Sequence, residues 1–431
     1  WPVCPLIFCR LPVSRPMARL GRVLAVLGLA DALPSSRAEL KADHFQILEP
    51  PQEDNTSCGL GDPYRFLVRT PPQGPNVKEL ALEFFGGGGC WNLTTCNAST
   101  TGWGGQEAKK FWMTRTGLDE LQSLLGAELQ GCAVPGFGRG LWDFCKEEHP
   151  FRTWQWVALP YCTGDQHLGN NVARYPDGEG GFLEVQHVGA RNADSVLRWV
   201  QSLFPDLERI YVTGESAGGW ASFAWTAEIA RRFPNAQVTG WADSSLHLLC
   251  PSSECDEALK TVSESWGAPN EFTEGGLWTT EALQPGWGLP EFLADTLKSF
   301  KGRVRFGIFT RTADEEQLLF WDLFGGLKDK WTEGLVSLLH SFERDASPAL
   351  LRTFVSPGAT HGIHRSEEVW TLQVQGIRFV EWLRDLGGCQ AHAARVWDPA
   401  VGVAASYVAE NASEAAAYSC AAPTTTPVPG D

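Results

Sequence analysis

The stretch Gly214-Glu215-Ser216-Ala217-Gly218 follows an apolar run at residues 209–213 and precedes a run of helical character at residues 220–232. A serine between two glycines, placed between a strand and a helix, is typical of a nucleophile elbow. The turn is sharp and strained, and a side chain at either glycine would clash with the neighbouring strand or helix. The pattern predicts that the Ser216 hydroxyl stands exposed at the tip as a nucleophile. The alternative is a tight connection without chemistry.

Apolar runs that predict strands alternate along the chain with segments of helical period. The strand candidates are residues 80–85, 154–160, 209–213, 237–242, 304–310 and 351–355. The helix candidates are residues 182–204, 220–232, 318–340 and 367–386. Strands that alternate with helices favour an α/β fold with a mainly parallel sheet and helices on both faces. Residues 97–150 and 245–300 are expected to be insertions that cap the sheet.

The N-terminal region has the features of a targeting segment. Residues 17–22 are basic, residues 23–30 form a short apolar run, and the polar residues 34–38 offer a cleavage site. The alternative is a buried N-terminal helix. Residues 1–16 precede the first Met, and the sequence leaves open whether they are translated. The apolar run is too short to span a bilayer, so we expect no membrane insertion.

We expect three regions: a targeting segment at 1–38, one catalytic domain at 39–390, and a tail or linker rich in small residues at 391–431. The length of 431 residues suits one large α/β domain with insertions or two modest domains. The formal net charge is −16. Nucleic acids and anionic membranes bind basic patches, so this charge argues against both as partners. We expect a monomer.

Cysteines and sequons point to secretion. Two of the twelve cysteines lie in the first 16 residues, and the other ten are an even number, which indicates disulfides formed in an oxidising compartment. Local bridges are expected for Cys90/Cys96 and Cys250/Cys255, and the other pairings stay open. No Cys-x-x-Cys motif and no mixed Cys/His cluster has zinc-ligand spacing, so we expect no metal. We also expect no cofactor. Four glycosylation sequons begin at Asn55, Asn92, Asn97 and Asn411.

A serine nucleophile needs a base within hydrogen-bond reach and a carboxylate that orients the base. In α/β-hydrolases these residues occur in the order Ser, acid, His, each on a loop after a strand. Asp314 follows the strand expected at 304–310, and His361 follows the one expected at 351–355. The sequence therefore predicts Ser216, Asp314 and His361 as the catalytic residues.

Each partner of the serine has a rival. Asp243 follows the strand after the elbow and competes as the acid, with a turn or helix cap as its other role. His364 competes as the base, but His361 is favoured because a Pro-Gly turn precedes it and a glycine follows it. The His-x-x-His spacing also suits a metal pair, yet no third ligand is nearby. Glu315 and Glu316 are expected at a solvated helix start.

The tetrahedral intermediate of acyl transfer needs preorganised N–H donors for its negative charge. One donor is expected from Ala217, the residue after the nucleophile. The others are expected from the four glycines at residues 86–89, which follow an earlier strand where lipases carry a glycine-rich sequence. Cys90 and Trp91 stand where a phosphate-binding loop needs Gly-Lys-Ser/Thr, which argues against a nucleotide site.

Four ordered motifs resemble the pectin acetylesterase/Notum family of secreted carboxylesterases. They are Gly86-Gly-Gly-Gly-Cys90-Trp91-Asn92, Tyr161-Cys162-Thr163-Gly164-Asp165, the elbow with Asp243-Ser244 after it, and Asp314-Glu315-Glu316-Gln317-Leu318. The resemblance covers residues 45–390 and implies an α/β-hydrolase fold. It implies Ser216, Asp314 and His361 as the triad, and an oxyanion hole from the N–H groups of Gly87, Gly88 and Ala217.

The resemblance implies a secreted serine carboxylesterase, and we expect it to remove O-acetyl groups from an extracellular polysaccharide. The alternatives are a Notum-like deacylase of a lipid-modified protein and a non-catalytic binding protein. The family usually has an aromatic residue in the glycine-rich loop, where this chain has Gly88 and Gly89. We therefore expect an acyl pocket of different shape, which weakens the transfer of a lipid-deacylase activity to this chain. The negative charge of this chain argues against polyanionic pectin as the substrate. Candidate substrate contacts are Trp91, Trp103, Tyr161 and Asp165, with a core role as the alternative for the tryptophans.

Overall fold

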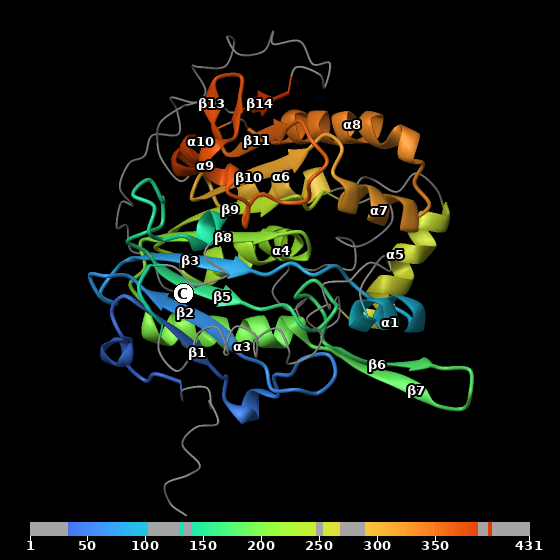
Figure 1. The fold of residues 1–431 in the computed structure, drawn as a ribbon, viewed down its shortest axis with the longest axis horizontal. Coiled ribbons are helices and arrows are strands. Elements are labelled where there is room, and N and C mark those ends of the chain that lie inside the picture. Colours follow the sequence, from blue (N-terminus) through green and yellow to red (C-terminus); the bar gives the residue numbers. More distant parts are fainter. Residues whose placement is uncertain are drawn as a thin grey trace, which may run out of the picture.

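The structure, a computed structural model, describes residues 33–101, 129–132, 139–246, 253–267, 289–347, 349–386 and 395–398. Within these ranges, ten strands form one sheet in the order β14-β11-β10-β9-β8-β3-β5-β2-β1-β4 (Figure 1). The strands of this sheet are β1 (His44–Leu48), β2 (Phe66–Thr70), β3 (Glu79–Phe84), β4 (Leu129–Gln130), β5 (Gln155–Leu159), β8 (Arg209–Glu215), β9 (Gln237–Asp243), β10 (Val304–Arg311), β11 (Leu351–Ser356) and β14 (Arg395–Trp397).

The strands from β14 to β5 run parallel to one another, whereas β2, β1 and β4 join by antiparallel pairing. The register brings the carboxyl ends of the central strands to one edge. Phe84 of β3 pairs with Gly214 of β8, Glu215 with Asp243 of β9, and Asp243 with Phe309 of β10. Loops that follow these strands therefore open at the same edge, as ligand sites in α/β sheets do.

Helices cover both faces of the sheet, as the alternation of strands and helices predicts. One hydrophobic cluster packs the sheet against α3, α4, α6 and α8, and a second packs the opposite face against α9 and α10 (Figure 1). The helices are α1 (Leu93–Thr101), α3 (Gly189–Leu203), α4 (Ala217–Arg232), α5 (Ser253–Trp266), α6 (Leu289–Ser299), α7 (Glu315–Leu323), α8 (Trp331–Asp345), α9 (Glu368–Thr371) and α10 (Phe379–Leu386). The predicted α/β fold with a mainly parallel sheet is confirmed.

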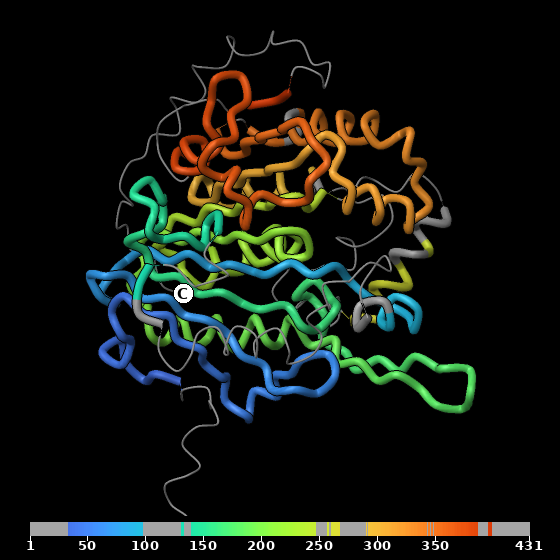
Figure 2. Tube along the Cα trace, in the orientation of Figure 1, coloured from blue at the N-terminus to red at the C-terminus, as the bar shows by residue number. Residues whose placement is uncertain are grey.

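Three expected helices have different limits. Residues 182–204 begin as a strand, β7 (Phe182–His187), which pairs with β6 (Asn171–Pro176) in a hairpin that projects from the body (Figure 2). The helix α3 starts only at Gly189, whose N–H donates to the Asp165 carboxylate. Residues 182–187 pack against a partner strand, so the tertiary environment overrides their helical period.

The other two differences come from glycine turns. Residues 318–340 form two helices, because Gly325 adopts a φ of +80° between α7 and α8. Residues 367–386 are interrupted by the short hairpin of β12 (Gln373–Val374) and β13 (Ile377–Arg378), whose turn includes Gly376 at a φ of +80°. A left-handed backbone conformation ends a helix and costs glycine little.

Three disulfides join Cys58 to Cys162, Cys90 to Cys96, and Cys132 to Cys145. The expected local bridge Cys90–Cys96 is therefore confirmed. Cys250 lies outside the described residues, as do the segment at 1–32 and most of the tail. In the part of the chain that the structure describes, no helix combines the length and the apolar character that crossing a membrane requires.

Candidate active site

Ser216 lies between the end of β8 and the start of α4, where it adopts a φ of 57° and a ψ of −122°. A positive φ is costly for a residue with a side chain and is common at nucleophile elbows and other strained functional sites. The turn closes because its glycines allow it: a Cβ on Gly218 would collide with the carbonyl oxygen of Phe84, and one on Gly214 with the backbone of Gly218. Ser216 N–H donates to Asp243 O at 2.8 Å and fixes the turn.

Asp314 caps the N-terminus of α7. Its Oδ1 accepts hydrogen bonds from the N–H groups of Glu316 at 3.1 Å and Gln317 at 3.0 Å, and its side chain is fully buried. His361 Nδ1 donates to the same carboxylate, at 2.8 Å from Oδ1 and 3.0 Å from Oδ2. Because Asp314 orients the ring through Nδ1, Nε2 is the nitrogen left to accept a proton.

The second ring nitrogen of His361 is buried and has no hydrogen-bond partner in the described part of the chain. Glu316 Oε2 lies 3.6 Å from it. Burial disfavours the charged ring, but the hydrogen bond to Asp314 and the charges of Asp314, Glu316 and Glu215 outweigh burial and raise the pKa of His361 to about 9. The structure shows no bond from Ser216 Oγ to this nitrogen, and such bonds often tighten only when substrate is bound.

The loop that carries His361 packs against the elbow. Gly362 adopts a φ of +71°, and a Cβ there would lie 2.5 Å from the Glu215 carboxyl carbon. Only a residue without a side chain fits so close to the residue that precedes Ser216. The fold therefore brings the three predicted catalytic residues, which come from the ends of β8, β10 and β11, to one edge of the sheet.

The glycine-rich loop after β3 lies on the other side of the elbow. A Cβ on Gly86 would lie 3.0 Å from the Ser216 Cβ, which shows how closely the two backbones approach. Tyr161 holds the loop, because its ring packs on Gly87 and its hydroxyl donates to Gly88 O at 3.0 Å. The N–H groups of Gly87, Gly88 and Ala217 donate to no acceptor among the described residues, so the prediction of an oxyanion hole there is compatible with the backbone.

The rival acid and the rival base of the sequence analysis pair with each other. His364 Nδ1 donates to Asp243 Oδ2 at 2.9 Å, and both side chains are fully buried. Asp314 makes the contact to His361, so Asp243 does not take its place in this structure. The His-x-x-His spacing thus provides two histidines that each bind a different aspartate. Sequence reasoning weighed both residues as rivals and missed their pairing.

Three of the four candidate substrate contacts, Trp91, Tyr161 and Asp165, are buried and bonded or packed inside the protein, which favours structural roles for them. Asp165 is fully buried and accepts hydrogen bonds from Thr163, His167 and Gly189. Burial, only partly offset by these bonds, raises the pKa of Asp165 to about 6. Tyr161 is 4% exposed, with its hydroxyl bonded inside the protein, and Trp91 stacks on Phe324 in the core. Trp103 lies outside the described residues.

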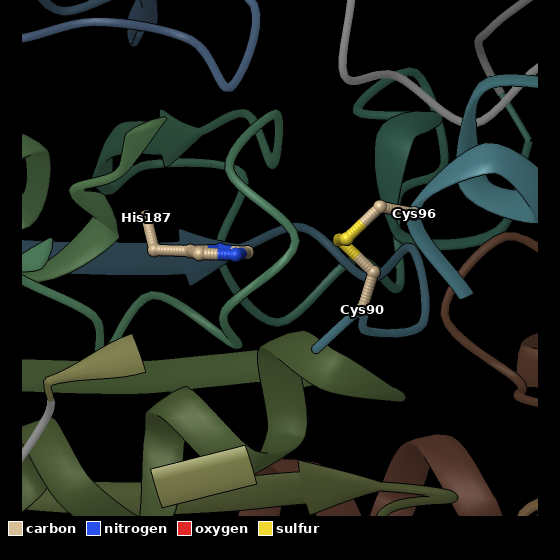
Figure 3. Close-up of side chains that lie close together, drawn as sticks. All are labelled: Cys90, Cys96 and His187. Carbon is tan, nitrogen blue, oxygen red and sulfur yellow. A yellow bond between two sulfur atoms is a disulfide. The ribbon is translucent and has the colours of Figure 1, made fainter. Parts of the chain in front are cut away.

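Potential metal ligands also come together beside α1. Cys90, Cys96 and His187 have ligand atoms within 4.8 Å of one another, and Figure 3 shows the imidazole facing a disulfide. The two sulfurs are bonded to each other, so neither is a thiolate. Both ring nitrogens of His187 are also engaged, Nδ1 with Thr163 O and Nε2 with the Tyr175 hydroxyl, each at 2.8 Å. This donor set does not suit a metal ion.

Comparison with protein families gives a match over part of the chain. The family model described as Pectinacetylesterase matches residues 137–270, a range that includes Tyr161, Asp165, Ser216 and Asp243. No curated protein matches the chain. Members of this family are carboxylic ester hydrolases, and the three disulfides fit an extracellular protein. The match supports the assignment of this chain to the pectin acetylesterase/Notum-like family.

Proposed function

We propose that the protein is a secreted serine carboxylesterase that removes O-acetyl groups from an extracellular polysaccharide. The observation that carries the proposal is the hydrogen-bonded pair of Asp314 and His361 beside a serine held at a positive φ. A nucleophile at a strained elbow, a base oriented by a buried carboxylate, and a glycine-rich loop with unused N–H groups are the parts that acyl transfer requires.

The reaction would proceed in two steps. Neutral His361 takes the proton of Ser216 through Nε2 while Oγ attacks the acetyl carbonyl, and the oxygen of that carbonyl becomes negatively charged. The imidazolium then returns the proton to the sugar oxygen as the ester bond breaks, which leaves an acetyl-enzyme. Water then attacks the acetyl carbon while the same histidine takes its proton, and the imidazolium gives that proton to Ser216 Oγ as the bond between Oγ and the acyl carbon breaks and acetate leaves. The N–H groups of Gly87, Gly88 and Ala217 would stabilise the oxyanion in both steps.

A small acyl group is supported by the surroundings of the glycine-rich loop. Trp266 of α5 lies next to Gly89, where an added Cβ would be 3.4 Å from its ring. The indole donates to Cys90 O at 2.7 Å and is buried, so it is firmly held there. An indole fixed beside the loop leaves less room for a long acyl chain than for an acetyl group. A sugar as the alcohol is supported by the match to the Pectinacetylesterase family model and not by the nineteen tryptophans, because twelve of them are buried in the fold.

The test is hydrolysis of p-nitrophenyl esters of increasing chain length, followed by acetate release from acetylated polysaccharides. Ser216→Ala should lose activity by roughly 10³-fold or more, because the proposed acyl-enzyme forms on the Ser216 hydroxyl. Ser202→Ala, a change to a serine on α3, is the matched control and should keep the full rate. Equal rates for wild type and Ser216→Ala would refute the proposal and favour a non-catalytic binding protein. A preference for long acyl chains would favour a deacylase of lipid-modified protein instead.

A further inference from the structure

Asp243 contacts two of the segments that the proposed reaction depends on. It is the last residue of β9 and is fully buried. Its backbone oxygen accepts the hydrogen bond from Ser216 N–H. Its side-chain Oδ2 accepts hydrogen bonds from the N–H groups of Ile363 at 2.7 Å and His364 at 2.8 Å, just after His361. One residue therefore holds both the nucleophile and the loop of the base.

The ring of His364 adds a second connection to the nucleophile strand. Its Nδ1 donates to Asp243 Oδ2, and its Nε2 is hydrogen-bonded to Thr213 Oγ1 of β8 at 2.9 Å. The ring also stacks on Trp241 of β9, with centroids 4.2 Å apart and planes within 7°. Burial opposes charge on both partners, but their mutual hydrogen bond and attraction raise the pKa of His364 and lower the pKa of Asp243. This hydrogen-bonded, buried pair therefore connects β8, β9 and the His361 loop.

Ser244 extends these contacts to the strand of the acid. Its N–H donates to Phe309 O of β10 at 2.9 Å, and β10 leads into Asp314. Its Oγ accepts the hydrogen bond from Gly362 N–H at 3.1 Å. The backbone of Ser244 adopts a φ of 50°, which directs the chain across the strand ends. Figure 1 shows β8, β9 and β10 as neighbours at the centre of the sheet.

We propose that Asp243 is a positioning residue: together with Ser244 and His364 it clamps the His361 loop to the elbow and sets the distance between base and nucleophile. The inference rests on the proposed function, in which Asp314 and not Asp243 orients the base. Loss of the side chain would leave two buried N–H groups after His361 without an acceptor. A loop displaced by about 1 Å is enough to lower the rate roughly 100-fold.

The experiment compares Asp243→Ala, Asp243→Asn and Ser244→Ala with wild type. The measurements are kcat and KM for an acetyl ester, the pH profile of kcat/KM, and hydrogen exchange of the segment 357–366. Asp243→Ala should lower kcat about 100-fold with KM nearly unchanged, keep the acid limb of the pH profile where it is, and speed exchange in that segment. Asp243→Asn keeps an oxygen acceptor and should recover most of the loss. Val196→Ala, a core change in α3, is the control for general destabilisation and should alter neither kcat nor exchange in 357–366.

Two results would overturn the proposal. One is that a folded Asp243→Ala variant exchanges its amide hydrogens in segment 357–366 at the wild-type rate. If Asp243→Ala fails to fold, the same result in folded Ser244→Ala takes its place. The other is a pH profile in which Asp243→Asn displaces the acid limb while Asp314→Asn does not, because Asp243 would then orient the base. The two proposals can also fail separately. If the wild-type protein hydrolyses no ester but Asp243→Ala still speeds hydrogen exchange in segment 357–366, the proposed function is refuted and the clamp stands.

Discussion

Replacing Glu316 by glutamine is expected to make the protein a faster esterase at neutral pH. The Glu316 carboxylate lies 3.6 Å from His361 Nε2, the nitrogen that must be unprotonated to act as the base. The pKa of His361 is raised to about 9, partly by this charge, so most of the protein at pH 7 carries a protonated ring. Glutamine keeps the shape of the side chain and removes the charge.

The size of the effect follows from Coulomb's law. Two unit charges 3.6 Å apart in water interact by about 1 kcal/mol, and the 62% exposure of the Glu316 side chain justifies a water-like dielectric. Since one pKa unit corresponds to about 1.4 kcal/mol, the pKa of His361 should fall by roughly 0.5–0.8 unit. Below the pKa, kcat/KM follows the unprotonated fraction, so at pH 7 it should rise about 3- to 6-fold.

The assay is the pH profile of kcat/KM for an acetyl ester at low and high salt. The acid limb of Glu316→Gln should shift to lower pH, and the shift should shrink in 1 M salt, where the screening length is only about 3 Å. Glu315→Gln makes the same charge change on the same helical turn and should shift the limb less, because the ion pairs of His361 in the described part of the chain are with Asp314 and Glu316 and not with Glu315. An unmoved limb, or one displaced to higher pH, would refute the assignment of His361 as the base.

Three further predictions concern stability. Gly218→Ala should destabilise the fold by about 3 kcal/mol or more, seen as a lower urea midpoint, because its Cβ would collide with the backbone of Phe84. The pKa of Asp165 is raised from 3.8 to about 6, so below pH 4 this group adds about 3 kcal/mol to the free energy of unfolding. That contribution is lost as the pH rises through 6. Asp165→Asn should abolish that slope in denaturation at several pH values, and an unchanged slope would contradict it. Replacing Cys58 and Cys162 by serine removes a disulfide that joins residues with a sequence separation of 104. The free energy of unfolding, measured by thermal denaturation, should fall by up to about 5 kcal/mol.

The centre of the fold could be predicted because its signals are local and repeated. The strands around the elbow are short apolar runs in the sequence, and the helix expected at residues 220–232 is present as α4, which begins directly after Ser216. The limits of other helices could not be predicted from period alone. Residues 182–187 acquire their strand character from pairing with β6, and the break at Gly325 depends on a left-handed turn. Such features depend on neighbours that a local pattern does not contain.

The candidate site shows the same division. Asp314 and His361 could be expected to meet because both follow parallel strands whose carboxyl ends share an edge. The pairing of Asp243 with His364 joins residues 121 positions apart, and their spacing in sequence says nothing about which histidine each aspartate binds. Glu316 is solvated, as expected, yet its carboxylate reaches Nε2, a contact set by a side-chain rotamer that no sequence motif encodes.

The backbone conformation of Ser216 is determined by contacts with three strands and not by its five-residue motif alone. A positive φ at a serine costs about 1–3 kcal/mol, and a pentapeptide alone offers nothing to offset it. In the fold, the backbone oxygen of Asp243 in β9 accepts a hydrogen bond from Ser216 N–H, and Phe84 of β3 lies so close to Gly218 that no side chain would fit there. The strain therefore persists because β3, β8 and β9 together determine the turn. The same contacts connect the nucleophile to Asp243, and so to the loop of His361, which explains why one buried aspartate can control the spacing of base and nucleophile without contacting substrate.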